Sequence, residues 1–568
     1  MTARGVASKL FIVASFFALV LGLSARVSHT QLKYKGVPQD WSHRHLIFTS
    51  TDPIEHPSLV NAEPRLMHRL LARAKGSFRS NAAAMAAVSP AAAAAKATDW
   101  NIALGAKVLI GNAPAEFTAD LANPSCTNDY VVFAVNGLGV TGGQATLIGV
   151  NGLYTGNGFT GGKCTPPAHA GPFVMFAYNT STITQGRIRT SPVLSLDGKK
   201  IAFVEANTTT SVLHVVTWAS NTTNPACGTG GTQNGCRAGQ SAAPGVGNAG
   251  SMVTVTYANA ANGTNSSASS PWIDYDTDTM YVGADDGAIH KITGVFNTAT
   301  PTVVTTGGWP ATVRAGAKLT SVVQDKISGK LFVGDNKGFL NAISYTTPGT
   351  VQSLAVGKSN KRNGIIFDAP LVDSGHGTVF VTSPNDGTSA VLVEADTTNL
   401  AQMARIRIGA GGVADNVVLY DGDVNNNYVE IGPSAGSMLV CGTDTNTAAP
   451  ALYSLPFIGT TIQPDSTPQV IVNSTTARCS PITGFFNENL AGGSDFFFWG
   501  VTDTCGPSGN GCVMKMVNGG AIFQADATGG TSAIIVDQDV NGAQTSNIYF
   551  SNQTNPLRGN KLTQSNLN

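Results

Sequence analysis

The stretch SSPWIDYDTDTMYVGADDGAIHKI at residues 269–292 holds two short runs rich in β-branched and aromatic residues, separated by a turn. A similar stretch, TSVVQDKISGKLFVGDNKGFLNAI, follows at residues 320–343. Apolar residues alternate within each run, which is typical of strands that bury one face. Asp286 and Gly287 occupy a turn, and Asp-Gly pairs suit the positive φ angles that tight turns require. The pattern predicts a repeated antiparallel unit.

The same strand–turn–strand pattern recurs from Asp99 onward. Its openings lie at residues 128–135, 191–207, 269–292, 320–343, 369–386, 416–431, 480–503 and 532–552. Consecutive openings are about 50 residues apart, and the spacing is longer where Gly/Asn-rich insertions intervene, as at residues 221–250. Such a period is typical of β-propeller blades, and ring closure would protect the strand edges. The sequence therefore predicts an all-β propeller with eight blades, with seven blades as the alternative.

The two ends of the repeat region complement each other. The eighth opening is followed by too few residues for a complete four-stranded blade, whereas DWNIALGA at residues 99–106 precedes the first opening and has no blade of its own. We therefore expect residues 99–106 to complete the last blade as its outer strand.

The residues before Asp99 differ from the repeat region. Arg4 and Lys9 precede an apolar run at residues 10–25, which predicts that residues 1–25 are a signal peptide or a short anchor. Residues 26–98 are predicted to be a basic, Ala-rich leader or linker, and residues 99–568 the propeller. A basic amphipathic helix is expected at residues 61–80, with its apolar side formed by Leu66, Leu70, Leu71 and Phe78. A spacer is favoured over a helix that docks on a membrane or partner.

Charge is unevenly distributed along the 568 residues. Residues 1–96 contain 12 of the 34 basic and 4 of the 34 acidic residues, which leaves 22 basic and 30 acidic residues for the rest. A mildly acidic body argues against a nucleic-acid partner, which requires a clustered positive field. Membrane contact is expected only through the N-terminal segment, if that segment is uncleaved.

The cysteines suggest export to the periplasm, the cell surface or the extracellular space. Their number is even, and we expect sequential neighbours to pair, although eight cysteines allow 105 pairings. The eight are Cys126, Cys164, Cys227, Cys236, Cys441, Cys479, Cys505 and Cys512. The chain contains neither a CxxC nor a CxxCH motif, which argues against a zinc ribbon and excludes a covalently attached c-type haem.

Two turns carry alternating oxygen ligands suited to Ca²⁺. Carboxylates and amides at positions one, three and five of a tight turn can coordinate this ion. The candidate ligands are Asp421, Asp423 and Asn425 in the first turn, and Asp537, Asp539 and Asn541 in the second. The bidentate Glu expected at position twelve is replaced by Gly432 and Ile548. An ordinary Asp/Asn turn between strands is the alternative.

The repeated stretches at 270–292 and 320–343 resemble the repeat of quinoprotein-type (PQQ-like) β-propellers. SPVLSLDGKKIAFVEA at residues 191–206 is similar to the related repeat of Tol-associated periplasmic propellers. The resemblance covers about residues 99–552 and implies the propeller fold. Quinone-dependent members bind their cofactor over the central axis with Ca²⁺, a Trp platform, a catalytic Asp and adjacent cysteines. This chain has no adjacent cysteine pair, and it also looks similar to secreted propellers without assigned activity.

No catalytic motif stands out. HExxH is absent, and the histidines of the repeat region are scattered as His169, His214, His290 and His376. We therefore predict no catalytic residues and no cofactor, with Ca²⁺ as the one candidate ion. The favoured function is an exported, non-catalytic propeller that binds a protein or carbohydrate ligand or acts as a scaffold. The alternatives are a quinone (PQQ)-dependent oxidoreductase and a carbohydrate-active enzyme.

Overall fold

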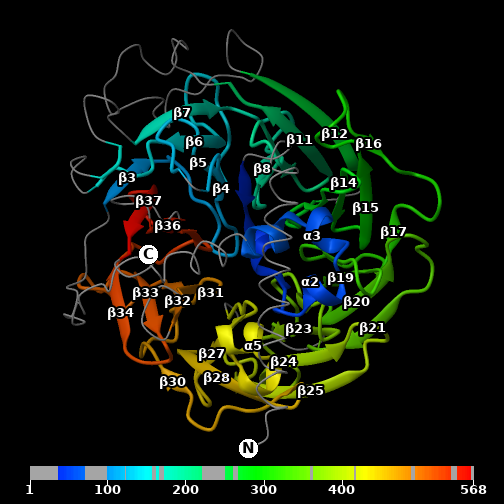
Figure 1. The fold of residues 1–568 in the computed structure, drawn as a ribbon, viewed down its shortest axis with the longest axis vertical. Coiled ribbons are helices and arrows are strands. Elements are labelled where there is room, and N and C mark those ends of the chain that lie inside the picture. The colour runs from blue at the N-terminus through cyan, green and yellow to red at the C-terminus, as the bar shows by residue number, and fades with distance from the viewer. Residues whose placement is uncertain are drawn as a thin grey trace, which may run out of the picture.

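Eight antiparallel sheets surround a common axis and form a β-propeller (Figure 1). The computed structural model describes residues 36–70, 99–121, 123–156, 162–164, 172–219, 250–259, 266–358, 363–414, 417–487, 493–538 and 546–564. The eight-bladed prediction is confirmed.

The first four blades follow each other in sequence, and each begins with its innermost strand. Blade 1 contains β4 (Ala115–Thr118), β5 (Tyr130–Ala134), β6 (Leu147–Asn151) and β7 (Phe173–Tyr178). Blade 2 contains β8 (Arg187–Ile188) and β9 (Val193–Leu194), which both pair with β10 (Lys200–Ala206), then β11 (Thr210–Thr217) and β12 (Ser251–Asn259). Blade 3 contains β13 (Trp272–Asp274), β14 (Thr279–Gly283) and β15 (Ala288–Thr293), which pairs with β16 (Thr302–Val303) and β17 (Ala311–Thr312). Blade 4 contains β18 (Val323–Asp325), β19 (Lys330–Gly334), β20 (Phe339–Ser344) and β21 (Gln352–Ala355).

The last four blades complete the ring. Blade 5 contains β22 (Leu371–Asp373), β23 (Thr378–Ser383), β24 (Ser389–Asp396) and β25 (Gln402–Ala410). Blade 6 contains β26 (Asp423–Val424), α5 (Asn426–Glu430), η4 (Pro433–Ala435), β27 (Ser437–Thr443) and β28 (Pro450–Ile458), which pairs with β29 (Thr461–Ile462) and β30 (Gln469–Val470). Blade 7 contains β31 (Thr483–Asn487), β32 (Ser494–Val501), β33 (Cys512–Val517) and β34 (Ile522–Asp526). Blade 8 contains β35 (Ile535–Gln538), β36 (Ser546–Ser551), β37 (Arg558–Thr563) and β3 (Trp100–Ala103).

The repeated stretch at 269–292 forms the first three strands of blade 3. Trp272 of β13 lies opposite Tyr281 of β14, and the turn before β15 contains Gly287 at a φ of 82°. A Cβ atom at this glycine would lie 1.7 Å from the Arg314 carbonyl oxygen, so both the positive φ and the close backbone approach require glycine. The apolar residues of these strands join the largest buried core of the ring.

The ring closes as the sequence predicts. β3 pairs antiparallel with β37, with Trp100 opposite Lys561 and Ile102 opposite Gly559, and becomes the outer strand of blade 8. Trp100 is buried, and its indole nitrogen donates to the Leu153 carbonyl oxygen of blade 1 at 3.2 Å. The first strand of the repeat region therefore connects the last blade to the first.

Two predicted openings differ from the observed strands. The stretch at 128–135 contains β5, the second strand of blade 1, because the inner strand β4 lies earlier and has no obvious repeat signature. The pattern of the sixth opening predicts a strand through YVEI, but this segment belongs to α5. The Asn425 side chain caps this helix by accepting from the Tyr428 amide at 3.2 Å, which favours helix over strand locally.

The segment before the repeats contributes to the fold in its described part. Residues 36–70 include β1 (Val37–Gln39), η1 (Trp41–Arg44), β2 (Leu46–Ile47), α2 (Asp52–Glu55) and α3 (Leu59–Ala62), and residues 64–70 are helical. This channel segment, drawn in blue in Figure 1, lies at the centre of the ring. The expectation of a spacer without a role in the fold is therefore wrong for residues 36–70. The division into leader and propeller at residue 99 stays a prediction.

Within the expected helix at 61–80, residues 64–70 are helical up to the end of this described stretch, and the extended Glu63 separates them from α3, which ends at Ala62. Leu66 is buried in the core shared with blades 3 to 5, and Leu70 packs against that core. The apolar side therefore faces the ring, while Leu71 and Phe78 lie outside the described residues.

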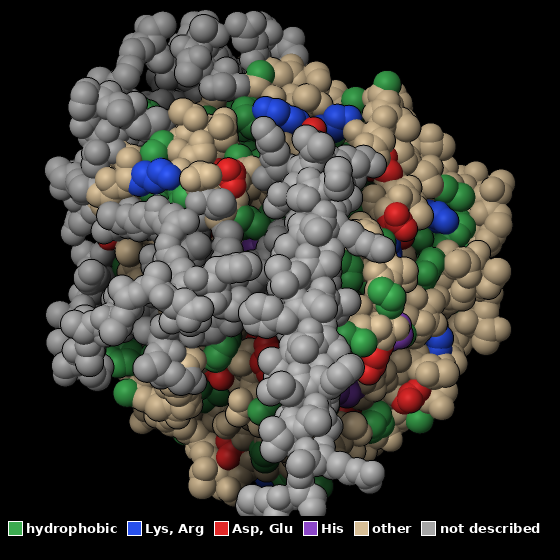
Figure 2. All heavy atoms as spheres, in the orientation of Figure 1, with side chains coloured by type: hydrophobic (Ala, Val, Ile, Leu, Met, Phe, Trp, Pro, Cys, Tyr) green, Lys and Arg blue, Asp and Glu red, His purple; other side chains and the backbone are tan. Residues whose placement is uncertain are grey.

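The described residues contain no helix that is long and apolar enough to cross a membrane. Figure 2 presents one face of the ring, where the described Lys and Arg side chains lie mostly toward the rim and form no continuous basic band.

Candidate functional site: the filled central channel

Residues 37–47 enter the channel as a hairpin-shaped insertion. β1 is antiparallel to β4 of blade 1, whereas β2 is parallel to β22 of blade 5. Because the innermost strands of a propeller run the same way through the ring, the chain passes down one side of the channel and returns along the other. The turn at η1 therefore lies toward one end of the channel, and Gly36 and Ser50 lie toward the other.

The turn is held by local hydrogen bonds and by blade 3. Asp40 accepts from the Ser42 amide at 3.0 Å, and its own amide donates to His43 Nδ1 at 3.2 Å, so that both form a capping box. The Trp41 indole nitrogen donates to the Pro271 carbonyl oxygen at 3.2 Å. Its ring lies edge-on to Trp272 at a centroid distance of 5.9 Å. An aromatic pair therefore fixes the turn against the channel wall.

Arg65 provides a second buried anchor to the same blade. Its guanidinium lies 4.1 Å from the Trp272 ring centroid and donates to the Ile273 carbonyl oxygen at 3.3 Å. Within the channel segment it also donates to Glu63 at 2.6 Å and to the Ser42 hydroxyl at 3.0 Å. Burial lowers the pKa of Arg65, but Glu63 and other neighbours outweigh burial and raise it overall. Arg65 therefore stays charged and paired inside the ring.

Arg44 faces two buried carboxyl groups of blades 5 and 6. Its Nη2 donates to Asp368 Oδ2 at 2.8 Å, and its Nη1 donates to the Ile482 carbonyl oxygen of blade 7 at 3.4 Å. The Asp421 amide donates to the same Asp368 oxygen at 3.3 Å. Both oxygens of Asp421 are buried without a hydrogen-bond partner.

The two carboxyl groups differ in how they are compensated. Burial raises the pKa of Asp368, while the Arg44 charge opposes the rise. Burial, and then the Asp368 charge, raise the pKa of Asp421 well above its usual range. Asp421 therefore favours the neutral acid, and Arg44 neutralises Asp368. The neighbouring His45 has its pKa lowered well below its usual value by burial and by Arg44, so it is uncharged at neutral pH.

The first predicted calcium turn does not direct its oxygens to one point. Asp421 faces Asp368, whereas the Asp423 carboxylate accepts from the Gly484 amide at 2.7 Å. Asn425 uses its side-chain oxygen to cap α5 and to accept from the Ser437 amide at 3.0 Å. These three side chains serve three different partners, and no group of three His, Cys, Asp or Glu side chains in the described part of the chain could hold a metal ion.

The second predicted turn is described only at Asp537. This buried carboxylate accepts from the Tyr549 hydroxyl at 3.1 Å and lies beside Asn547 at 3.4 Å. Asp539 and Asn541 lie outside the described residues. Calcium binding at either turn therefore stays a prediction.

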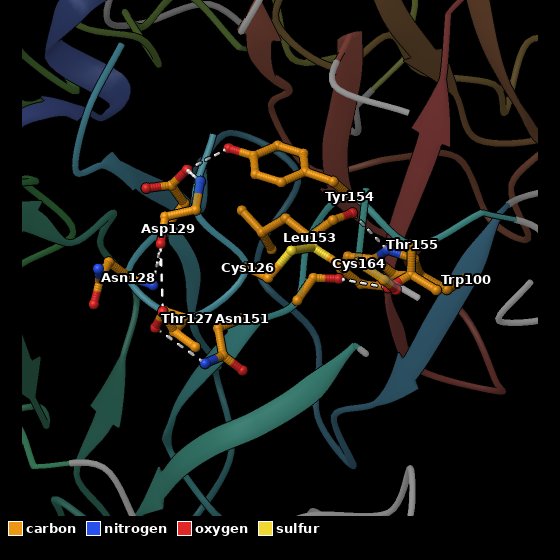
Figure 3. Close-up of a disulfide and its surroundings, with 12 residues drawn as sticks. Trp100, Cys126, Thr127, Asn128, Asp129, Asn151, Leu153, Tyr154, Thr155 and Cys164 are labelled. Carbon is orange, nitrogen blue, oxygen red and sulfur yellow. Dashed lines mark hydrogen bonds between the residues drawn. A yellow bond between two sulfur atoms is a disulfide. The ribbon is translucent and has the colours of Figure 1, made fainter. Parts of the chain in front are cut away.

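Three of the four predicted disulfides are present in the described residues. Cys126–Cys164, Cys441–Cys479 and Cys505–Cys512 each join sequential neighbours. The fourth expected pair, Cys227 and Cys236, lies outside the described residues. Figure 3 shows that the Cys126–Cys164 disulfide lies near Trp100 and Tyr154, where blade 1 meets the closing strand. This bond therefore stabilises the region in which the ring closes.

A buried carboxylate adjoins this disulfide. Asp129 accepts from the Tyr154 hydroxyl at 2.7 Å (Figure 3). It also accepts from the Ser125 amide at 2.6 Å. Burial raises the pKa of Asp129 to about 6 in spite of these hydrogen bonds.

The described histidines of the repeat region each contact a carboxylate. His214 lies 2.9 Å from Glu205, His290 lies 3.1 Å from Asp286, and His376 lies 2.9 Å from Asp373. Because the three pairs belong to blades 2, 3 and 5, they do not converge on one site. His169 lies outside the described residues.

The repeat pattern does not predict a role for the channel residues, because they lie before the first repeat. The stretch DWSHRHLIF at residues 40–48 combines a capping Asp, a Trp, basic residues and an apolar end, which is unusual for a linker. This composition is the feature of the sequence that could have indicated a structured segment here. No sequence rule, however, predicts which carboxylates across the ring would meet Arg44.

Comparisons with known proteins add only a likeness of fold. No protein-family model and no curated protein matches the chain. Among solved structures it is similar to BamB from Moraxella catarrhalis, with 13% identity, a TM-score of 0.38, and coverage of 69% of this chain and 86% of that chain. It is also similar to the WD40 domain of coronin from Toxoplasma gondii, with 14% identity, a TM-score of 0.39, and coverage of 76% and 83%. These low values carry no argument about function, and the resemblance to PQQ-like repeats stays a prediction.

Proposed function

We propose that the protein is an exported, non-catalytic β-propeller that binds a protein or carbohydrate partner or acts as a scaffold. An eight-bladed ring suits this role because it offers broad faces on a closed framework. The three disulfides are compatible with export. The observation that carries the proposal is that the channel segment occupies the centre of the ring.

The occupied channel bears directly on the quinone-dependent alternative. A cofactor over the central axis would need the space where Trp41, Arg44 and Arg65 contact blades 3, 5 and 7. The purified full-length protein should therefore leave the absorbance of added pyrroloquinoline quinone and Ca²⁺ unchanged and should reduce no dye with alcohols or sugars. A bound quinone after gel filtration, or dye reduction lost on quinone removal, would overturn the non-catalytic assignment.

The carbohydrate-active alternative depends on paired carboxyl groups. Asp368 and Asp421 are such a pair, but Arg44 and His45 of the channel segment adjoin them. We expect no hydrolysis of a polysaccharide panel by the intact protein. Hydrolysis that disappears in Asp421→Asn and persists in the exposed-site variant Asp276→Asn would establish the enzyme instead.

Partner binding can be tested from exposed positions of the ring. Ile431 and Ile458 of blade 6 and Phe523 of blade 7 are large apolar side chains exposed to solvent. A photo-crosslinking amino acid at these positions should capture a discrete macromolecule in the producing cell. The buried position Val440 of β27 is the matched control and should capture none. Absence of crosslinks at all three exposed positions would argue against a binding module.

Export is tested by locating the protein and reading its N-terminus. We expect it outside the cytoplasm, with either a start after the apolar run at residues 10–25 or an intact run that retains it in a membrane fraction. A cytoplasmic protein with reduced cysteines would contradict the proposal.

A further inference from the structure

The channel segment docks on blades 5 and 6 through the corner at residues 49–55, which we call the latch. The Ser50 amide donates to the Val429 carbonyl oxygen at 2.9 Å, and the Ser50 hydroxyl donates to the Glu430 carbonyl oxygen at 2.8 Å. Asp52 Oδ1 faces the turn after β22, where a Cβ atom on Gly375 would lie only 2.3 Å from it. The latch therefore fits against two blades with little spare room.

Three buried carboxyl groups are linked through Asp373, whose charge acts on both Asp52 and Glu394, and their hydrogen bonds are unequal. Asp373 accepts from His376 Nδ1 at 2.9 Å and from the Tyr428 hydroxyl at 2.6 Å. Asp52 accepts from the Thr49 amide, but its Oδ1 has no hydrogen-bond partner. Glu394 accepts from the Ile462 amide at 2.9 Å, but its Oε1 has no hydrogen-bond partner. Of these three groups, only Asp373 is equipped to carry a full negative charge.

The charged groups around Asp52 come from each element packed there. Glu55 and His56 belong to or follow α2, Asp373 and His376 belong to the β22 turn of blade 5, and the Tyr428 hydroxyl of α5 binds Asp373. His376 has a raised pKa because of its hydrogen bond to Asp373, so it balances that carboxylate. Among the described residues no ion pair joins a cation to Asp52, and the electrostatic field of His56 lowers the pKa of Asp52 by less than burial raises it.

Burial explains why Asp52 and Glu394 favour the neutral acid. Burial raises the pKa of Asp52 from 3.8 to about 6, and the Asp373 charge adds to the rise. Burial also raises the pKa of Glu394 from 4.5 to about 7, again with a contribution from Asp373.

We propose that residues 49–55 form a pH-dependent latch, which holds the channel segment when Asp52 is protonated and loosens it when Asp52 ionises beside Asp373. The docked state binds more protons than the released state between about pH 4 and 6. Docking therefore weakens as pH rises through that window. Loosening the latch would free the Ser50 contacts to α5 and expose the β22 turn on that face of the ring.

Hydrogen exchange on the full-length protein tests the latch. Protection factors, corrected for intrinsic exchange at each pH, should be at least about tenfold lower at pH 8 than at pH 5 for amides of residues 50–56, since one pKa unit corresponds to a tenfold change. Amides of β36 in blade 8 serve as the internal reference, because Ile548 and Phe550 are buried in a core that contains no described residue of the channel segment, and their protection should not change.

Matched variants assign the effect to the carboxyl groups. Asp52→Asn keeps the size and the acceptor of a neutral acid, so the latch should stay protected at both pH values. Glu394→Gln should leave most of the pH dependence in place, because Glu394 accepts from the Ile462 amide and not from the latch. The exposed-site control Asp276→Asn should behave like the natural protein, because that side chain is 61% exposed.

Two results would overturn the latch. The first is equal protection of residues 50–56 at pH 5 and pH 8. The second is an undiminished pH dependence in Asp52→Asn, especially together with its loss in His376→Gln, because the switch would then belong to the imidazole.

Discussion

Replacing Arg44 by Met should destabilise the protein through the buried carboxylate that Arg44 neutralises. Arg44 Nη2 lies 2.8 Å from Asp368 Oδ2, and the two side chains are only 10% and 9% exposed. Removing one partner of a buried ion pair leaves an uncompensated charge and costs about 3–5 kcal/mol. Asp368 can reduce this cost by binding a proton, because burial already raises its pKa. We therefore expect the lower end of that range, about 3 kcal/mol at pH 7.

The partner and control variants make this magnitude specific. Asp368→Asn alone should also destabilise, because it leaves the Arg44 charge without its carboxylate. In the double variant Arg44→Met/Asp368→Asn the loss should be at least about 2 kcal/mol smaller than the sum of the single losses. The matched control is Lys318→Met, which breaks an ion pair to Asp285 of nearly equal length, 2.9 Å, but with a lysine that is 64% exposed. Asp285 is only 11% exposed, but solvent screens the charge of the exposed lysine, so we expect this pair to contribute about 0–1 kcal/mol.

Urea unfolding followed by tryptophan fluorescence and by circular dichroism measures these differences. The loss caused by Arg44→Met should shrink at pH 5, because protonation of Asp368 becomes easier when Arg44 is absent. A loss equal to that of the lysine control, or additive single losses in the double variant, would refute the reasoning. In that case the ring would not depend on the charge of the channel segment.

Three further perturbations address ring closure, titration and the disulfides. Trp100→Ala removes a buried indole and its hydrogen bond to the Leu153 carbonyl oxygen, and it should lower the free energy of unfolding, measured by thermal unfolding, by about 3–5 kcal/mol. A loss below about 1 kcal/mol would contradict the role of Trp100 in ring closure. Burial lowers the pKa of Lys561 from 10.5 to about 8, so the unfolded chain binds more protons than the folded protein between these pH values, and the free energy of unfolding should rise with pH across that window. Lys561→Met should flatten this rise when denaturant titrations are repeated at several pH values. An unchanged slope would exclude the lysine as its source. Replacing both Cys505 and Cys512 by Ser should lower the free energy of unfolding by about 2.5 kcal/mol relative to the natural protein under oxidising conditions, because the unfolded chain then gains conformational entropy. An unchanged midpoint of urea unfolding would show that this disulfide does not stabilise the fold.

The blade repeat could be predicted because it is a local pattern. In the stretch at 269–292, strand alternation and an Asp-Gly turn specify three consecutive antiparallel strands without reference to the rest of the chain. Ring closure could be predicted in the same way, because the sequence shows an incomplete last blade and a strand before the first blade. The structure pairs this strand, β3, with β37 of the last blade. Where local chemistry competes with the repeat, the prediction is wrong: the Asn425 cap turns the expected strand at 428–431 into α5.

The channel could not be predicted because its contacts are not local. Arg44 meets Asp368 across 324 positions of the chain, and Trp41 meets Pro271 across 230. Each residue looks ordinary in its own stretch, and only ring geometry brings them together. The turn at 421–425 is the opposite case, in which a local pattern suggests a site that the structure does not assemble. Its alternating oxygens resemble an ion site in sequence, yet in the ring they face three different neighbours.

Two described segments before Leu104, residues 36–70 and 99–103, stabilise the ring at its axis and at its rim, and they do so at different stages of chain synthesis. β1 and β2 pair on the axis with β4 and β22, which are complete once blade 5 is made. β3 pairs at the rim with β37 and must wait for nearly the whole chain. Each of these pairings closes a loop of chain, and the entropic cost of loop closure rises only slowly with loop length. The pairing of β3 with β37 is therefore formed much later than the axial pairings but is only slightly less favourable. The channel segment can therefore organise blades 1 to 5 before the ring is complete. Until β37 arrives, β3 remains an unpaired strand, and that interval is when exposed edges favour association between chains.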